Sequence, residues 1–211
     1  MRRRPSPTPL AGKILVVGGQ CRKVGKTALC VDLIRLMGDL PWTAVKITPH
    51  SESGCPVQGA TCGCPEWEHT FSIREESSEY TGKDTARYLR AGAKSAFWVQ
   101  TKAGCLVDAL DRLRGLLEGA RCVLIESDAI ARFWQPELFL MVLDPRKADF
   151  KASARVELAS ADLFLLRAPL AAGGLDAPVL DRLEETRQFL QPFGYPLPSY
   201  MQKLVRQHFH P

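Results

Sequence analysis

The tripeptide Gly25-Lys26-Thr27, set between an apolar run and a helical pattern, points most directly to a chemistry. Backbone N–H groups of such a loop face phosphate oxygens, the lysine reaches the β- and γ-phosphates, and the threonine hydroxyl can coordinate Mg²⁺. The usual pattern, G-x-x-x-x-G-K-[ST], would begin with glycine at position 20, where Gln20 stands after Gly19, so the loop is one residue longer. The residues expected to bind a nucleotide are Gly19, Arg22, Lys23, Val24, Gly25, Lys26, Thr27 and Ala28.

Two acidic residues follow an apolar run further along the chain. Residues 122–126 read CVLIE, so Glu126 ends a predicted strand and Asp128 lies two residues beyond it. Beside a phosphate loop, such a carboxylate binds Mg²⁺ or orients water, whereas in the alternative it is a strand-end acid facing solvent. We expect Lys26 and Glu126 to be catalytic, and Thr27, Glu126 and Asp128 to hold Mg²⁺.

Three further charged residues are candidates for substrate binding. Lys46 interrupts the apolar run TAVKI, where a lysine either has a partner at the strand end or holds an anionic substrate as a point charge. Asp84 is expected to cap a helix within GKDTARYLRAGA, which Gly92 would end. Arg87 lies on one face of that helix, where it would bind phosphate or simply be solvated.

A cysteine-rich segment is the candidate for a second metal. Cys55, Cys62 and Cys64, flanked by His50 and His69, supply thiolates and imidazoles that can form a tetrahedral Zn²⁺ site. The spacing is not a standard C-x-x-C pattern, so reduced surface thiols are the alternative, and an iron–sulfur cluster is a third.

The elements that must position these residues alternate along the chain. Apolar runs predict strands at residues 14–17, 43–47, 96–100, 122–126, 138–143 and 162–166. Helical patterns cover residues 26–37, 85–91, 105–117, 151–158 and 177–190, with a short terminal helix at 199–207. This alternation predicts an α/β fold, a three-layer P-loop NTPase sandwich with a mainly parallel sheet.

One domain accounts for most of the chain. Residues 11–192 are expected to form it, with a cysteine-rich insert at 48–83 that is read as a long loop. The basic, proline-rich residues 1–10 are expected to be a disordered tail, and residues 193–211 a C-terminal extension.

Composition excludes several classes of function. The 211 residues are 45% apolar and 24% charged, as in ordinary soluble proteins. Of the net charge of +5, three units come from Arg2, Arg3 and Arg4, which leaves too little to argue for nucleic acid. No window has the length of a membrane span, and seven scattered cysteines favour reduced thiols in a cytoplasm.

Taken in order, these motifs resemble the molybdopterin-guanine dinucleotide biosynthesis protein B family. The resemblance covers residues 14–144 and rests on the phosphate loop, the strand carrying Lys46 with His50 after it, GKDTARYLRAGA and VLIES. It implies a small, often dimeric GTP-binding protein that assists nucleotide attachment to the molybdenum cofactor. Lys26 and Thr27 would then bind phosphate and Mg²⁺, Glu126 would be the Walker B acid, and Asp84 the acid of the middle motif. Ser127 stands where that family usually has glycine.

The longer loop is instead similar to that of dethiobiotin synthetase, an ATP-dependent enzyme with a substrate lysine after its second strand. Three functions therefore stay open: a Mg²⁺-dependent, slowly hydrolysing NTPase that works with a protein partner, an ATP-dependent ligase or kinase, and a metal-responsive binding module. After residues 162–166 the chain lacks the Asn-Lys-x-Asp pattern that reads guanine. GTP thus rests on the resemblance, and ATP is the alternative.

Overall fold

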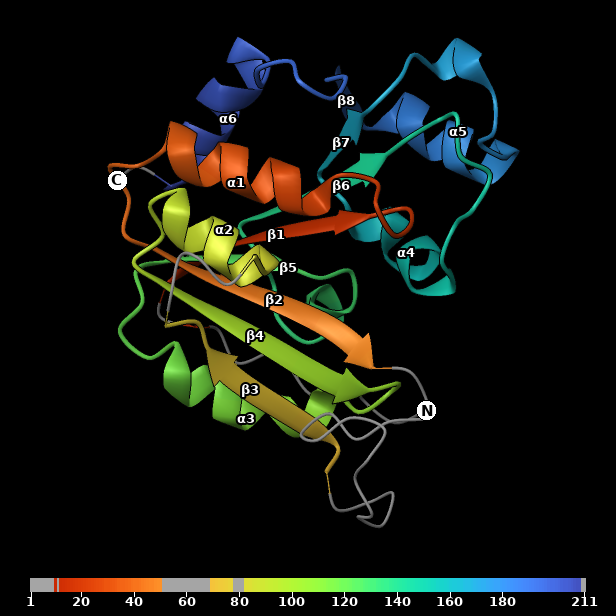
Figure 1. Cartoon of the computed structure of the whole chain (residues 1–211). Helices are drawn as coiled ribbons and strands as arrows, with labels where there is room; N and C mark the ends of the chain where they lie inside the picture. Colours follow the sequence, from red (N-terminus) through yellow and green to blue (C-terminus); the bar gives the residue numbers. More distant parts are fainter. Residues whose placement is uncertain (1–9, 11, 51–68, 78–81, 210–211) are drawn as a thin grey trace.

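The computed structural model describes residues 10, 12–50, 69–77 and 82–209. Within them, eight strands form one sheet in the order β3-β4-β2-β5-β1-β6-β7-β8, flanked by helices (Figure 1). Every pairing is parallel except that of β3 with β4. The strands are β1 (Lys13–Gly19), β2 (Trp42–His50), β3 (Phe71–Glu75), β4 (Ser95–Lys102), β5 (Cys122–Glu126), β6 (Leu138–Leu143), β7 (Leu163–Leu166) and β8 (Arg187–Leu190).

Helices cover both faces of this sheet. They are α1 (Lys26–Leu36), α2 (Asp84–Arg90), α3 (Leu106–Leu116), α4 (Ala152–Glu157), α5 (Ala177–Glu185) and α6 (Ser199–Phe209), with short 3₁₀ turns η1 (Ala129–Arg132), η2 (Leu158–Ser160) and η3 (Leu170–Ala172). Side chains of α1, α2 and α6 pack in one core cluster, and those of α3, η1 and α5 pack in a second.

The two clusters explain why the central strands are apolar over most of their length. Leu15 and Val17 of β1 belong to the cluster with α1, whereas Ile14 and Val16 belong to the cluster with α3. Alternate side chains of a strand point to opposite faces, so a strand covered on both faces has no solvated position. The predicted three-layer α/β fold is confirmed.

The structure corrects the prediction of a long loop over residues 48–83. β2 continues to His50, and Phe71–Glu75 form the edge strand β3 inside that range. Among the described residues, β3 pairs with one neighbour, and Phe71 and Ile73 are its two side chains that pack against the core. Its sequence therefore lacks a strong apolar signal.

A second correction concerns the predicted helix at residues 177–190. α5 ends at Glu185, and Thr186 is already extended, with φ −123° and ψ 147°. The next four residues form β8 beside β7, and Phe189 packs against the core. A four-residue strand is too short to show an alternation that differs from a helical pattern.

The segment 193–211 includes a helix that closes one side of the core. Met201, Val205 and Phe209 of α6 are buried, and the Phe209 ring centroid lies 5.2 Å from that of Trp42. Arg206 Nη2 donates to the Leu36 carbonyl at the end of α1 over 2.7 Å. Within the part of the chain that is described, no helix has both the length and the apolar character needed to cross a bilayer.

We predict that Phe209→Ala lowers the free energy of unfolding by about 3–5 kcal/mol, because it leaves a cavity beside Trp42. Urea denaturation followed by circular dichroism measures the change. Lys203→Ala, at an exposed position of the same helix, is the control, with an expected effect within about 0.5 kcal/mol. Equal, small effects of both substitutions would show that α6 does not contribute to the core.

Candidate functional site

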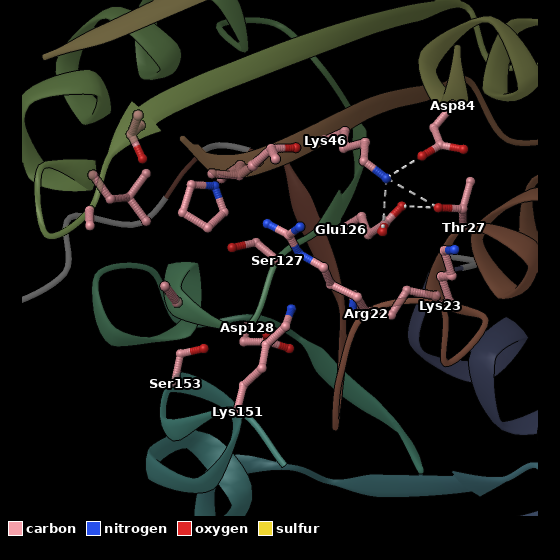
Figure 2. A pocket seen from close by; sticks show the side chains of 18 of the residues that line it. Arg22, Lys23, Thr27, Lys46, Asp84, Glu126, Ser127, Asp128, Lys151 and Ser153 are labelled. Atoms are coloured by element: carbon pink, nitrogen blue, oxygen red, sulfur yellow. Dashed lines mark hydrogen bonds and ion pairs between the residues drawn. The ribbon is translucent and has the colours of Figure 1, made fainter. Parts of the chain in front are cut away.

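The carboxyl end of β1 is where the sheet divides. In the sheet, β5 and then β2 lie on one side of β1, and β6, β7 and β8 lie on the other. In open parallel sheets, ligands bind outside the carboxyl strand ends at such a switch point. A cavity of about 780 Å³ lies there (Figure 2). Its walls come from the loop after β1, the ends of β2, β4 and β5, and the starts of α2, α3 and α4.

Most residues expected to bind a nucleotide line this cavity. They are Arg22, Lys23, Gly25, Lys26, Thr27 and Ala28. Val24 does not line it, because its side chain is fully buried in the core cluster beneath the loop. Gly19 does not line it either, since it still belongs to β1 and its N–H donates to Asp128 Oδ1 over 2.6 Å.

Local backbone geometry shapes the loop. Gly25 has a φ of 98°, and a Cβ at this position would lie 2.7 Å from Phe193 Cε1 and 2.9 Å from Arg167 Nη2. Glycine is therefore required both for conformation and for close packing. The Lys26 ammonium donates to the Cys21 carbonyl over 3.0 Å, and burial lowers the Lys26 pKa from its ordinary value.

Gln20 explains how the longer loop is accommodated. Its side chain is fully buried and turned toward the segment after β6, where its Oε1 accepts from the Asp144 N–H and its Nε2 donates to the Lys147 carbonyl. Its backbone carbonyl accepts from the Lys151 N–H over 2.9 Å. Gln20 is thus a buried anchor directly after β1.

Three side chains converge on the ammonium group of a fourth, Lys46, at the edge of the loop. Lys46 Nζ lies 3.2 Å from Thr27 Oγ1 and 3.1 Å from Glu126 Oε1, and it also donates to Asp84 Oδ2 (Figure 2). Thr27 Oγ1 donates to Glu126 Oε2 over 2.8 Å, and the Tyr88 hydroxyl donates to the same oxygen. The strand register places Lys46 opposite Glu126 on neighbouring strands. We call Thr27, Lys46, Asp84 and Glu126 the ammonium cluster.

Electrostatics support this arrangement. Burial alone would lower the Lys46 pKa, but the carboxylates of Glu126 and Asp84 outweigh it and raise that pKa above its ordinary 10.5. Burial alone would raise the Asp84 pKa, yet Lys46 and Arg87 hold it below 3.8. One hydroxyl and two carboxylates around a cation are also the hard oxygen ligands that Mg²⁺ prefers, so the residues present fit this metal.

The structure gives some predicted residues other positions. Asp84 does not cap α2; it is the first helical residue, after the cap Lys83, and its side chain joins the ammonium cluster. Arg87 pairs with Asp84 over 3.1 Å and lines the cavity. Asp128 also lines the cavity, but its Oδ1 accepts the Gly19 N–H and so fixes the end of β1.

The candidate zinc ligands are not brought together in the described part of the chain. Cys55, Cys62 and Cys64 lie outside it. His50 is the last residue of β2, and His69 lies two residues before β3. Over the described ranges, no group of three or more His, Cys, Asp or Glu side chains is placed to hold a metal.

Some residues of the site were missed from the sequence. Tyr88 lies four residues after Asp84, so the helical period places both on one face of α2, and this signal was available. Lys102, Arg132 and Lys151 line the cavity from three separate segments, and no local pattern marks them. Arg132 is held by an ion pair with the buried Glu157.

The central sheet, the loop after β1 and the strand-end acid together define a P-loop NTPase fold, and solved structures agree. HypB from Helicobacter pylori, in complex with nickel, superposes with a TM-score of 0.52 at 14% identity, covering 93% of this chain and 87% of that one. LpxK from Aquifex aeolicus, in complex with ATP, gives a TM-score of 0.50 at 14% identity and covers 88% of this chain.

The alignment takes in 56% of LpxK, so this chain spans little more than half of that protein's length. Identity at this level shows a shared fold. A scan against protein-family models and a sequence search of curated proteins find no match.

We predict that Lys46→Met lowers the free energy of unfolding by about 1–2 kcal/mol near neutral pH. The expected loss is small because the Asp84 side chain is 36% exposed and water screens its charge. The lowered Asp84 pKa means that its contribution is present above pH 3.8 and is lost as the pH falls through the folded-state pKa. The raised Lys46 pKa means that its contribution is present below pH 10.5 and is lost as the pH rises through the folded-state value.

Urea denaturation of wild type and Lys46→Met across the pH range measures this. The difference in stability between them should form a plateau and shrink at both extremes. Lys94→Met, at an exposed position, should show no such profile. A difference that does not vary with pH would contradict the charge interaction.

Proposed function

We propose that this protein binds a magnesium-bound nucleoside triphosphate and hydrolyses it slowly. The observation that carries the proposal is the ammonium cluster, in which Thr27, Asp84 and Glu126 converge on one cation beside Lys26. A P-loop and a cluster of hard oxygen ligands at the same strand end are the parts that phosphoryl chemistry needs. Mg²⁺, when bound, neutralises phosphate charge and would be held by these three residues.

The residues of the chain then have distinct tasks. Backbone N–H groups at the start of α1 bind phosphate oxygens, and Lys26 stabilises charge that develops on the terminal phosphoryl group. Lys46 holds the three oxygen groups together before a ligand arrives, so a bound dication competes with it. Glu126 is restrained by Thr27 and Tyr88 and so keeps its orientation.

The finer assignment follows from the resemblance in motif order. It supports GTP as the nucleotide, molybdenum-cofactor assembly in the cytoplasm as the setting, and a homodimer that works with a protein partner. A partner or second subunit would add positive charge at the site, which accelerates otherwise slow hydrolysis.

One observation favours a second candidate, an ATP-dependent ligase or kinase. The cavity extends beyond the phosphate loop to the ends of two strands. It is lined there by Thr48 and Pro49 of β2 and by Thr101 and Lys102 of β4. Among the described residues, eight basic and three acidic side chains line it, a surplus that suits a second anionic ligand beside the nucleotide.

Titration of the purified protein with labelled GTP and ATP, with and without Mg²⁺, tests the proposal. Lys26→Ala should weaken triphosphate binding by about 10- to 100-fold, because a charge-assisted hydrogen bond to phosphate is lost. Lys94→Ala is the control with no expected change. Absence of binding to both nucleotides in wild type would refute the proposal. Tight ATP binding without measurable GTP affinity would favour the ligase or kinase.

A second prediction separates the two candidate metal-binding acids. Asp84→Asn should raise the Mg²⁺ concentration needed for nucleotide binding by about tenfold or more, because a ligand charge is lost. Asp128→Asn should leave it nearly unchanged, because the amide oxygen can still accept the Gly19 N–H. Magnesium titrations at fixed nucleotide concentration make the comparison, and the opposite ranking would assign the metal to Asp128.

A further inference from the structure

The side of β1 opposite the ammonium cluster carries a buried polar network below an exposed aromatic turn. Arg167 follows β7 and is only 2% exposed. Its Nη1 donates to the Gln191 side chain over 2.7 Å, and its Nη2 donates to the Gly25 carbonyl in the phosphate loop over 2.9 Å. Gln191 in turn donates to the Tyr195 carbonyl over 3.0 Å. The network joins the loop to the chain after β8.

Phe193 rests on this network. The Arg167 guanidinium carbon lies 4.7 Å from the centroid of the Phe193 ring, a cation–π contact. The ring edge packs so closely on Gly25 that no side chain would fit between them. Phe193 nevertheless remains 48% exposed, so about half of its surface faces solvent. A partly exposed aromatic ring that packs against a phosphate loop can stack on a flat ligand group.

The sheet order determines which part of a nucleotide would reach this ring. Strands β5 and β2 lie on one side of β1, whereas β7 and β8 lie on the other (Figure 1). Lys46 and Glu126 belong to β2 and β5 and contact Thr27, whereas Arg167 directly follows β7 and Phe193 comes three residues after β8. A triphosphate whose terminal phosphate faces the ammonium cluster therefore directs its nucleoside toward β7 and β8.

Arg167 itself is not available to read a base. It occupies the position after β7 where the sequence shows no Asn-Lys-x-Asp pattern. Its two Nη groups donate to Gln191 and Gly25, and the side chain as a whole is only 2% exposed, so it offers no donor at the surface. Its task is to hold the ring. Phe193 is then an exposed apolar surface directly beside Gly25 on that side of the loop.

We propose that Phe193 is the stacking platform for the base of the bound nucleotide, with Arg167 as the positioning residue beneath it. The inference rests on the proposed nucleotide binding and extends it to the recognition of the nucleoside. Stacking uses the π-face that every base has, so the contribution of Phe193 is similar for ATP and GTP. Discrimination between the two purines must come from other contacts.

The test compares ligands with and without a base. Calorimetry measures the affinities of ATP, GTP and inorganic tripolyphosphate for wild type and Phe193→Ala in the presence of Mg²⁺. The substitution should weaken both nucleotides by about 5- to 150-fold, the effect of one lost base stack, and leave tripolyphosphate unchanged. Phe193→Trp should retain nucleotide affinity. Tyr195→Ala, on the same turn at 65% exposure, is the matched control with no expected effect.

Each other outcome is decisive. Unchanged nucleotide affinity in Phe193→Ala overturns the stacking role. An equal loss for tripolyphosphate and nucleotides also overturns it, and assigns Phe193 to support of the Gly25 backbone. If wild type binds tripolyphosphate as tightly as it binds nucleotides, the base makes no contact and only the stacking inference fails. If wild type binds neither tripolyphosphate nor the nucleotides, both the proposed function and the stacking inference are refuted.

Discussion

The geometry of the site depends on the contacts that the Lys46 ammonium group makes with one hydroxyl and two carboxylates. Thr27, Asp84 and Glu126 belong to α1, α2 and β5, three elements that are distant in sequence. Two carboxylates placed this close repel each other unless a cation lies between them. Lys46 supplies that cation from the neighbouring strand, so α2 can lie against the end of β5 in the absence of a ligand. A dication would do the same with a higher charge.

The two sides of β1 differ in the chemical character of their side chains. On the β5 and β2 side the surroundings are charged, and they include the ammonium cluster and the basic cavity wall. On the β7 and β8 side, a guanidinium is buried and an aromatic ring covers it. A polar, highly charged group and a flat, weakly polar group thus find matching surfaces on opposite sides of one loop. A nucleotide has two such groups, the charged phosphates at one end and the flat base at the other.

Much of this could be predicted from local sequence, because the signals are local. The phosphate loop, the strand ending in Glu126 and the α/β alternation depend on short patterns, and the structure has the same elements. Asp84 was recognised as a candidate, but its contact with Lys46 depends on how α2 packs on the sheet, which no spacing reveals. β8 and Phe193 were missed for a similar reason. A four-residue edge strand has no distinctive period. The sequence also does not show that the exposed Phe193 packs against Gly25, because the two residues are far apart along the chain.

Gln20 limits which parts of the molecule can rearrange. Through its side chain and its carbonyl it makes hydrogen bonds with Asp144, Lys147 and Lys151, so the segment after β6 is tied to the start of the phosphate loop. On the other side, α2 is joined to the loop through exchangeable ionic contacts at Lys46, which a competing cation can take over. The two sides of the phosphate loop therefore differ in how they are held: by uncharged hydrogen bonds to Gln20 on the β6 side, and by ionic contacts to Lys46 on the α2 side.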